Sequence, residues 1–457
     1  MPSPVIEPAL LKTTLTAAVG SENLLGAPAL AHFAIDGVVP ATGAVPQTVE
    51  QAVAVMKAAH ALGLAVTARG GGTAMSYGSP PERVDVLLSM RRLNKILEHE
   101  PADLTCTVEA GITLGDLNEA LGKHGQTLPL EAPLAGQATI GGVLAVNASG
   151  PRRFAYGTAR DRLIGLRAIE ANGALIKGGG KVVKNVAGYD LPKMFIGSLG
   201  TLGIIVEATF KLSPLPKARA ALLAGFRDLG EALEAAQSLL KDGLRPNAFD
   251  LTNAAAHRRI AMRAGISDFS DRTYVLALDF GAGPAAVQRQ VSQAHRTVAQ
   301  AGGKTLVVDD ASMYDAYWRA VVDIGKTGDR PAAMITRASL LFTQLERIIH
   351  GHEALAESSR MEVALDVHLG VGIVRAAWFP DEPGLEADGL LAEAVATLRT
   401  AARNFEGYLV VESCAPGLKR LGDVWGPPGP DFAIMQRLKQ QFDPGRILSP
   451  GRLVGGL

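Results

Sequence analysis

The chain has 457 residues, 47% of them hydrophobic and 20% charged, the composition of a globular protein with two or three domains. Its 45 basic and 45 acidic residues balance, and no run of lysine and arginine occurs, so the sequence does not indicate nucleic-acid binding. Two cysteines, Cys106 and Cys414, are too few for a cysteine-held iron–sulfur cluster or a disulfide framework. No secretory signal or membrane span is indicated, which predicts a cytoplasmic protein.

The N-terminal third predicts alternating helices and strands. A helix is expected first, and a second one follows the capping pattern that Thr48 and Gln51 form. Short apolar runs rich in β-formers then predict three strands and one more helix. The expected elements are helix 8–19, helix 49–60, strand 64–68, strand 84–88, strand 105–109 and helix 116–122.

Three consecutive glycines, Gly70 to Gly72, follow the strand at 64–68. Without β-carbons their amides can close around phosphate oxygens, which indicates a nucleotide ligand. The loop fits neither common phosphate pattern, because Met75 stands where a dinucleotide fingerprint needs glycine and no Gly-Lys-Ser/Thr ending follows. Taken alone, the loop is better explained as an ordinary glycine turn between two strands, so the ligand hypothesis depends on support from other segments.

A second glycine-rich region, residues 129–212, alternates glycines with short β-rich runs at 163–169, 174–177 and 203–210. Thr139 precedes the pair Gly141 and Gly142, a combination that brings a hydroxyl and bare amides to one ligand. Arg153 and Arg160 add positive charge nearby. A surface ion pair involving Asp161 is an equally good explanation of these charges.

After a Pro-rich boundary at 213–216, strands and helices alternate up to residue 411. Their order is typical of two ferredoxin-like α+β halves placed side by side. The expected elements are strands 222–226, 249–251, 274–280, 304–308, 333–336, 361–369, 372–378 and 407–411, and helices 229–240, 285–300, 342–350 and 390–403. A tail with one helix, 432–441, follows from Trp425.

Taken together, these segments resemble one flavoprotein superfamily, that of vanillyl-alcohol oxidase and p-cresol methylhydroxylase (PCMH). Within it they resemble the FAD-linked 2-hydroxy-acid oxidases, and most of all the smaller FAD-binding subunits of bacterial glycolate oxidases. The matching motifs are RGGGT (69–73), IGG (140–142), YGTARD (156–161), KNVAGYDL (184–191), GSLGTLGII (197–205) and FDPGRILSPGR (442–452).

The resemblance implies an α+β fold with a two-part PCMH-type FAD-binding domain and a ferredoxin-like cap that carries the substrate side. On this basis residues 1–215 form the FAD-binding domain, in subdomains of about 36–104 and 105–215. Residues 216–424 form the cap, and the tail, 425–457, returns to the FAD-binding domain.

The resemblance also implies which residues hold FAD. Gly70 to Ala74 would wrap the pyrophosphate, Thr139, Gly141 and Gly142 would face pyrophosphate and ribose, and Gly203 and Ile205 would contact the adenine or ring system. The full set is Arg69, Gly70, Gly71, Gly72, Thr73, Ala74, Ser76, Pro133, Thr139, Gly141, Gly142, Asn147, Gly150, Arg153, Tyr156, Gly157, Asp161, Lys184, Tyr189, Gly203 and Ile205.

One position of the glycine loop bears on how the flavin is attached. Covalent members of the superfamily carry histidine where this chain has Thr73. A threonine hydroxyl does not form the usual bond to a flavin methyl group. The sequence therefore predicts non-covalent FAD.

The substrate side departs from the family pattern. Catalytic relatives hold a divalent metal with His-x-Gly-Asp-Gly-Asn-x-His and a later Glu-His-Gly. Here His368 keeps the first histidine, Arg375 replaces the second, and Glu412 is followed by Ser413. No metal is therefore expected. His368 is a candidate general base and equally a buried structural histidine, and Arg375 would bind a substrate carboxylate or form a salt bridge. Arg337, Lys326, Trp318 and Tyr189 are weaker candidates.

Two functions follow from the resemblance. In the first, the chain oxidises glycolate or D-lactate by hydride transfer to flavin N5. In the second, it binds FAD without turning over substrate and supports a related catalytic FAD subunit and an iron–sulfur subunit, which would also hold it at the inner membrane. A nicotinamide-dependent dehydrogenase is disfavoured, because the fingerprint is absent.

Overall fold

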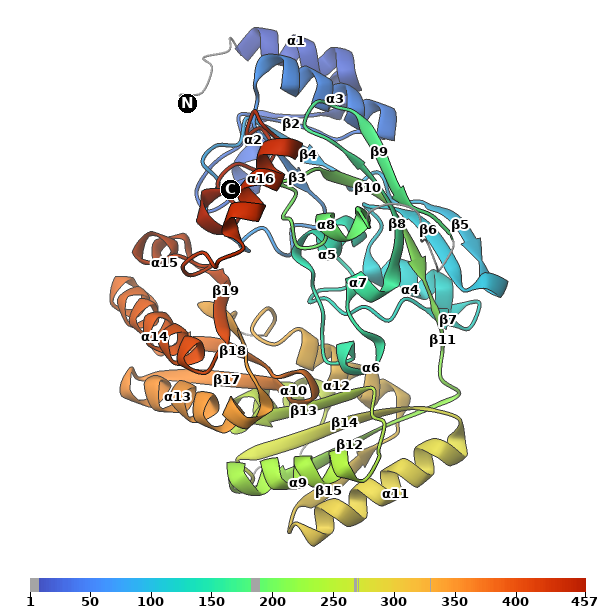
Figure 1. Ribbon diagram of the computed structural model, residues 1–457, viewed down its shortest axis with the longest axis vertical. Coiled ribbons are helices and arrows are strands. Elements are labelled where there is room, and N and C mark those ends of the chain that lie inside the picture. Colours follow the sequence, from blue (N-terminus) through green and yellow to red (C-terminus); the bar gives the residue numbers. More distant parts are fainter. Residues whose placement is uncertain (1–7, 182–189, 267–268, 270, 329) are drawn as a thin grey trace.

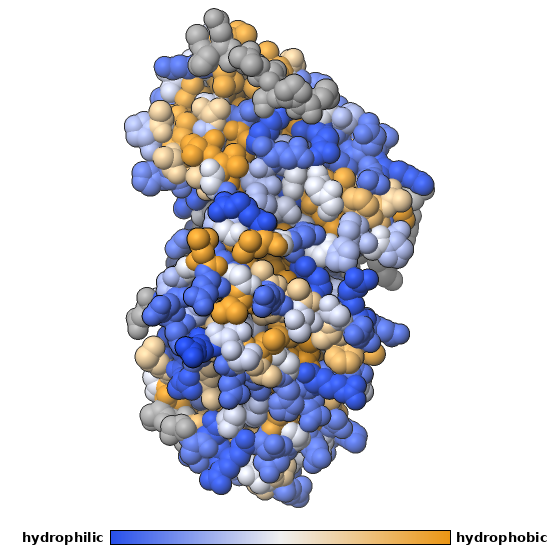
Figure 2. Space-filling view, turned by 90° about the vertical axis from the view of Figure 1, so that its left-hand side faces the viewer, coloured by the Kyte–Doolittle hydropathy of each residue, from blue (hydrophilic) through white to orange (hydrophobic). Residues whose placement is uncertain are grey.

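The computed structural model describes residues 8–181, 190–266, 269, 271–328 and 330–457, and Figure 1 shows two stacked parts. The upper part, here called the N-terminal domain, runs to β11 (Ser213–Pro214) and also contains the end of the chain. The lower part, the cap, is one large sheet with its helices. Figure 2 shows apolar side chains gathered over the upper part and polar ones over the lower end of the cap. Among the described residues no helix has the length and apolarity that a membrane crossing requires.

The first sheet of the N-terminal domain has the order β1-β2-β4-β3. Thr48 caps α3 (Val49–Leu62) by accepting a hydrogen bond from the Gln51 amide, and left-handed Gly63 ends the helix, as the capping pattern predicts. The core beneath this helix joins the sheet to α1. The other elements are α1 (Pro8–Val19), β1 (Leu24–Leu25), α2 (Ala27–Leu30), β2 (Thr42–Ala44), β3 (Val66–Arg69) and β4 (Val86–Ser89).

The second sheet is antiparallel and has the order β5-β6-β10-β8-β9. Thr113 caps α4 by accepting a hydrogen bond from the Asp116 amide at 3.0 Å. The three strands expected in the glycine-rich region are present as β8, β9 and β10, whereas β5 was not predicted. The elements are β5 (Ile96–Glu100), β6 (Thr105–Glu109), α4 (Leu114–Gly122), β7 (Gln126–Thr127), α5 (Ile140–Val146), α6 (Arg153–Tyr156), α7 (Ala159–Arg162), β8 (Leu163–Ile169), β9 (Leu175–Gly179), α8 (Pro192–Phe195) and β10 (Ile204–Lys211).

The cap is an eight-stranded sheet of order β15-β12-β14-β13-β17-β18-β16-β19. Each half has the ferredoxin-like strand order, and the halves meet where β13 pairs antiparallel with β17. The strands are β12 (Ala218–Phe226), β13 (Ala248–Asn253), β14 (Tyr274–Ala282), β15 (Lys304–Val308), β16 (Met334–Ser339), β17 (Met361–His368), β18 (Ile373–Pro380) and β19 (Tyr408–Cys414).

Helices cover the two faces of the cap sheet unequally. The four helices predicted from the repeating pattern pack on one face: α9 (Leu229–Lys241), α11 (Pro284–Gln300), α13 (Leu345–Ser358) and α14 (Leu385–Asn404). Two helices that were not predicted, α10 (Ala254–Ala264) and α12 (Ala311–Val322), pack on the other face. They are additions to the ferredoxin-like unit, so the repeating pattern gave no reason to expect them. They cover only part of that face and leave the rest to the N-terminal domain.

The tail returns to the N-terminal domain after α15 (Pro416–Leu421) and α16 (Phe432–Phe442). The Val66 amide donates to the carbonyl of Ile447 at 2.6 Å, and the Ser449 amide donates to the carbonyl of Val66 at 2.9 Å. Buried Lys439 donates to the carbonyls of Thr201 and Leu448 and to Asp443. The tail thereby joins both sheets of the N-terminal domain.

Replacing Lys439 with methionine should therefore destabilise the N-terminal domain. The change removes three hydrogen bonds and leaves the buried Asp443 carboxylate without its cation. We expect a loss of about 3 kcal/mol, measured as a lower urea midpoint of tryptophan fluorescence. Arg446→Ala removes an exposed ion pair with Glu82 and an exposed hydrogen bond to the Gly456 carbonyl, and should cost far less. Equal losses in the two variants would contradict this role of Lys439.

Candidate functional site

Three adjoining cavities run from the cap into the N-terminal domain. The first, of about 870 Å³ including its open mouth, lies between the cap sheet and the N-terminal domain. It shares Thr73, Ala74 and Gly142 with the second cavity, which follows the glycine loop. The second shares Gly70 and Thr139 with the third, which ends at Gly203 to Ile205. Together they form one elongated track, suited to a long ligand with chemically different ends.

The middle of the track exists because two loops approach each other more closely than side chains allow. A β-carbon at Gly71 would lie 1.7 Å from the carbonyl oxygen of Gln137, and one at Gly70 would lie 1.9 Å from the Thr139 hydroxyl. The first loop therefore requires glycine at positions 70 and 71. The sequence prediction that these glycines form a ligand cradle agrees with this geometry.

The cradle also offers unused hydrogen-bond donors. Within the described part of the chain, the amides of Gly71, Gly72, Thr73 and Ala74 donate to no other protein group. Thr139, at the start of α5, makes no side-chain capping bond. Consecutive free amides beside a hydroxyl are what a pyrophosphate needs, since its oxygens accept several hydrogen bonds at once. The residues present therefore fit a dinucleotide such as FAD.

Most of the predicted cofactor residues line the track, and some do not. Those in its walls are Gly70, Gly71, Gly72, Thr73, Ala74, Pro133, Thr139, Gly141, Gly142, Asn147, Arg153, Gly203 and Ile205. Outside these three cavities lie Arg69, Ser76, Gly150, Tyr156, Gly157 and Asp161. The Arg69 guanidinium covers the Phe33 ring, and Asp161 caps α7 by accepting a hydrogen bond from the Thr158 amide. Lys184 and Tyr189 lie outside the described residues.

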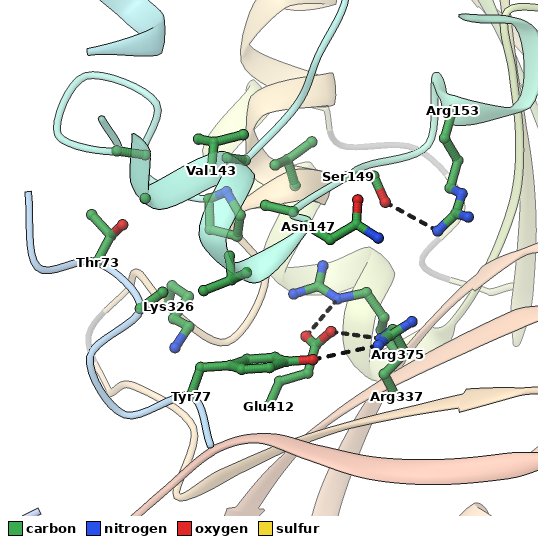
Figure 3. A pocket seen from close by; sticks show the side chains of 18 of the residues that line it. Thr73, Tyr77, Val143, Asn147, Ser149, Arg153, Lys326, Arg337, Arg375 and Glu412 are labelled. Atoms are coloured by element: carbon green, nitrogen blue, oxygen red, sulfur yellow. Dashed lines mark hydrogen bonds and ion pairs between the residues drawn. The ribbon is translucent and has the colours of Figure 1, made fainter. Parts of the chain in front are cut away.

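At the cap end of the track, Arg337, Arg375 and Glu412 meet (Figure 3). The carboxylate of Glu412 lies 3.0 Å from Arg337 Nε and 3.4 Å from Arg375 Nε. Arg337 also donates to the Tyr77 hydroxyl of the N-terminal domain at 3.4 Å. The salt-bridge alternative for Arg375 is therefore present in the structure, and the guanidinium still lines the cavity.

The cap end of the cavity carries more positive than negative charge. Arg153, Arg337, Arg375 and Lys326 line it, with Glu412 as the one acidic lining residue. Burial alone would raise the pKa of Glu412, but the positive charges of Arg375, Arg337 and Lys326 outweigh burial and lower that pKa. One carboxylate balances only part of this charge. The cavity is therefore suited to an anion.

His368 forms part of the cavity wall, and its other neighbours are acidic. Its Nδ1 lies 3.1 Å from Asp250 Oδ2 and 3.9 Å from Asp366 Oδ1, and the imidazole is only 2% exposed. Burial lowers the pKa of His368, partly opposed by the charge of Asp366. The imidazole is thus predominantly neutral at pH 7.

The metal set that the resemblance implies does not fit this chain. A guanidinium at 375 cannot ligate a cation, and it bonds the one carboxylate, Glu412, that the set would need. Ser413 instead donates to or accepts from Ser76 at 2.9 Å. No reaction step is assigned to a metal in that position.

Sequence reasoning missed several lining residues. Tyr77 follows directly on the glycine loop, so its position was a usable signal. Val146 lies one helical turn after Gly142 on α5, so helical spacing would have pointed to it, whereas Val143 and Ser149, the latter beyond the end of α5, carry no such signal. Arg452 and Leu199 enter from distant segments, and only the packing of the tail brings them to the loop.

Comparison with known families decides the assignment. Residues 40–179 match the FAD binding domain family, and residues 215–453, more than half of the chain, match the C-terminal domain of the FAD linked oxidases. The chain belongs to the FAD-linked oxidases. FAD binding is accordingly supported for this chain, and the assignment of the free glycine-loop amides to its pyrophosphate stays a prediction.

Relatives of this FAD-linked oxidase match it over most of its length. A D-2-hydroxyglutarate dehydrogenase of Xanthomonas citri pv. viticola is 29% identical, covering 91% of this chain and 89% of its own. Glycolate oxidase subunit GlcD of Bacillus subtilis is 26% identical, with 85% and 83% covered. The structure of p-cresol methylhydroxylase superposes with a TM-score of 0.78 at 16% identity, covering 97% and 96% of the two chains. The predicted fold class, an α+β PCMH-type FAD-binding domain with a cap, is confirmed.

Substituting Gly71 with alanine should weaken FAD binding strongly. The new methyl group would overlap the Gln137 carbonyl and push the two loops of the cradle apart. We expect at least a tenfold rise in the Kd for FAD, measured by flavin fluorescence quenching on reconstitution of apoprotein. Gly136→Ala is the matched control, because its β-carbon meets nothing within 4 Å. Similar affinities in both variants would contradict the cradle.

Proposed function

We propose that this FAD-linked oxidase oxidises a short 2-hydroxy acid, such as glycolate or D-lactate, to the 2-oxo acid. The observation that carries the proposal is the cation-lined cavity that adjoins the glycine cradle. When bound, FAD supplies an acceptor for the hydride of the substrate α-carbon. Relatives named D-lactate dehydrogenase and D-2-hydroxyglutarate dehydrogenase support this substrate class.

In this proposal the arginines bind the substrate carboxylate. Glu412 holds Arg337 and Arg375 side by side, so that their remaining N–H groups can face the cavity. Lys326 lines the same cavity, and burial lowers its pKa. A substrate carboxylate bound here would replace water around these cations. Its hydrogen bonds to them would hold the substrate's hydroxyl-bearing carbon in one orientation.

His368 serves the removal of the hydroxyl proton in this proposal. Among the described residues that line the cavity, it is the one imidazole. Its neutral ring can accept a proton or ligate a metal ion. As general base, His368 would accept the hydroxyl proton, and the neighbouring Asp250 and Asp366 would stabilise the positive charge on its ring.

The second candidate function is a subunit that binds FAD without turning over substrate. The Arg375–Glu412 contact favours it, because relatives with a complete metal motif use these positions as ligands. Such a chain would support a related FAD subunit and an iron–sulfur subunit, as part of a glycolate oxidase-like complex. It would then pass electrons between partners and would require them for activity.

Anaerobic mixing of the purified chain with substrate separates the two functions. We expect glycolate, D-lactate or D-2-hydroxyglutarate to bleach the visible absorbance of the oxidised flavin, since the isolated chain has both a cofactor cradle and an anion cavity. Arg375→Gln should raise the substrate concentration for half-maximal bleaching at least tenfold, because one carboxylate donor is lost. Arg219→Gln, in a pair exposed on the cap surface, should not.

The subunit hypothesis makes the opposite prediction for the same experiment. The isolated chain would keep its flavin oxidised with every acid, and bleaching would require a sister subunit. An isolated chain whose flavin stays oxidised would contradict substrate oxidation by this chain. A flavin that stays oxidised even with the sister subunit present would contradict both functions.

The flavin should be held without a covalent bond. Thr73, the loop residue that lines both the first and second cavities, offers a hydroxyl rather than an imidazole. After acid precipitation the flavin should remain in the supernatant, as measured by its absorbance. A yellow pellet that keeps its flavin after washing would show a covalent link.

A further inference from the structure

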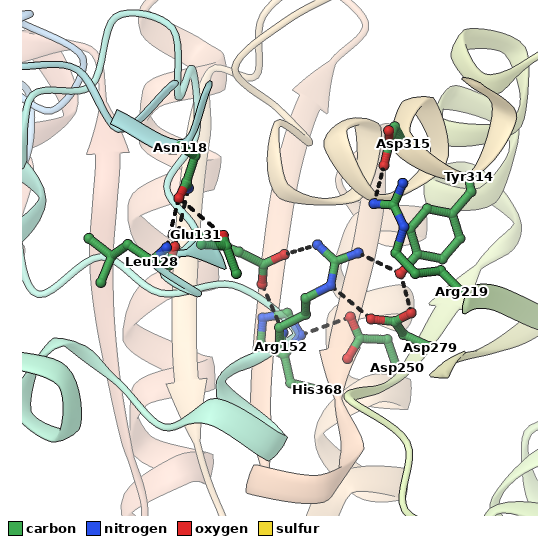
Figure 4. A network of polar contacts seen from close by, with 11 residues as sticks. Asn118, Leu128, Glu131, Arg152, Arg219, Asp250, Asp279, Tyr314, Asp315 and His368 are labelled. Atoms are coloured by element: carbon green, nitrogen blue, oxygen red, sulfur yellow. Dashed lines mark hydrogen bonds and ion pairs between the residues drawn. The ribbon is translucent and has the colours of Figure 1, made fainter. Parts of the chain in front are cut away.

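A cluster of buried polar side chains lies in the wall of the cavity, where the two halves of the cap sheet meet. Asp250 on β13 is directly opposite His368 on β17, and Asp366 is two residues before His368 on the same face. Their exposed fractions are 1%, 2% and 0%. Figure 4 shows His368 turned toward Asp250.

The polar atoms of the cluster have no hydrogen-bond partners of regular geometry in the described part of the chain, and its two carboxyl groups and one imidazole offer more acceptors than donors. Among the described residues, no atom makes a hydrogen bond of regular geometry to any carboxylate oxygen of Asp250 or Asp366, or to either ring nitrogen of His368. No described lysine or arginine lies within ion-pair distance of the two carboxylates. The hydroxyl of Tyr317 on α12 is also buried without a partner, and burial together with the charges of Asp250 and Asp366 raises its pKa.

Asp279 shows that this face of the sheet can satisfy a buried carboxylate. It lies on β14, beside β13, and is 0% exposed. Arg152 Nε donates to it at 2.8 Å, and Tyr314 donates to its other oxygen. Asp250, one strand away, and Asp366, two strands away, lack such partners among the described residues, and burial raises the pKa of both carboxyl groups. Keeping both of them charged without a cation would cost several kcal/mol.

We propose that Asp250, Asp366 and His368 bind a divalent transition-metal ion, Zn²⁺ or Mn²⁺. His368 Nδ1 lies 3.1 Å from Asp250 Oδ2 and 3.9 Å from Asp366 Oδ1, both within the ~4.2 Å that two metal–ligand bonds of about 2.1 Å can span. The ligand atoms of all three residues lie within 4.8 Å of one another, so the third separation needs at most a small side-chain adjustment. Two carboxylates balance the charge of the ion, and imidazole with carboxylate oxygen is a ligand set that both metals accept.

This site differs from the metal set of the catalytic relatives. It shares His368 on β17 with the set implied by the resemblance, but its other ligands are Asp250 on β13 and Asp366 on β17, whereas that set would use positions 375 on β18 and 412 on β19. Three protein ligands leave coordination positions open, as catalytic sites require. His368 lines the cavity whereas Asp250 and Asp366 do not, so an ion held by all three would lie behind the cavity wall and would act on the substrate side through His368. That use rests on the proposed function, whereas metal binding does not.

Metal content tests the site directly. The FAD-loaded full chain is stripped with EDTA, incubated with Zn²⁺ or Mn²⁺, desalted and analysed by inductively coupled plasma mass spectrometry. We expect one equivalent of metal per wild-type chain and a rise in Tm on loading. Asp250→Asn and Asp366→Asn should each lose the bound equivalent and the rise in Tm.

Two controls keep the result interpretable. Both asparagine variants are isosteric and remove a buried charge, so without metal their Tm should equal or exceed that of the stripped wild type. Glu412→Gln should keep its metal, because Glu412 is no ligand here. Loss of metal in Glu412→Gln but not in Asp250→Asn would overturn the proposal, and so would a wild type that binds neither ion. A chain that binds metal but reduces no flavin would overturn the proposed function and leave the site standing.

Discussion

The structure depends on how the polar face of the cap sheet is neutralised where it meets the N-terminal domain. Acidic and basic residues from six adjacent strands lie on this face, from Asp279 on β14 to Glu412 on β19. Arg152 of the N-terminal domain reaches across and pairs with Asp279, while Glu131 holds its other side at 2.8 Å. Burial alone would lower the pKa of Arg152, but these two carboxylates outweigh burial and raise it well above its usual value. The interface between the two domains is thus held together by largely buried ion pairs, in which Arg152 neutralises Asp279 and Glu131.

The cavity is the part of this interface that the protein's own charges leave unsatisfied. At one end, amides of the glycine loop have no protein acceptor among the described residues and can bind an anion. At the other end, among the described lining residues, the cations Arg153, Lys326, Arg337 and Arg375 outnumber the one carboxylate, Glu412. Both ends therefore favour anionic ligands, and they are joined through shared wall residues. A bound dinucleotide and a small acid satisfy this arrangement together, which is why the cofactor and substrate proposals support each other.

The departures from the catalytic relatives have a structural consequence. Arginine at 375 pairs with Glu412 and so removes both from a metal set, but His368 remains in the wall. Its neighbours in this chain are Asp250 and Asp366, which supply negative charge on the opposite side of the ring. A shift of the metal by one strand would preserve a metal beside the cavity while freeing Arg375 for the substrate carboxylate.

The sequence by itself determined the glycine cradle and the repeating cap. Gly70 and Gly71 stand out in the sequence because three consecutive glycines are a local pattern, and Thr139 stands out because a glycine pair follows it. The order of strands and helices in each cap half is likewise predictable from the local spacing of apolar residues. The helices α10 and α12 were missed because nothing in that repeat calls for them.

Only the tertiary structure decided which distant side chains meet. Asp250 faces His368 because β13 and β17, the inner edges of two separate halves, pair in one particular register. A shift of one residue would turn either side chain to the other face of the sheet. No local pattern encodes that pairing, since it depends on how two complete α+β units pack together.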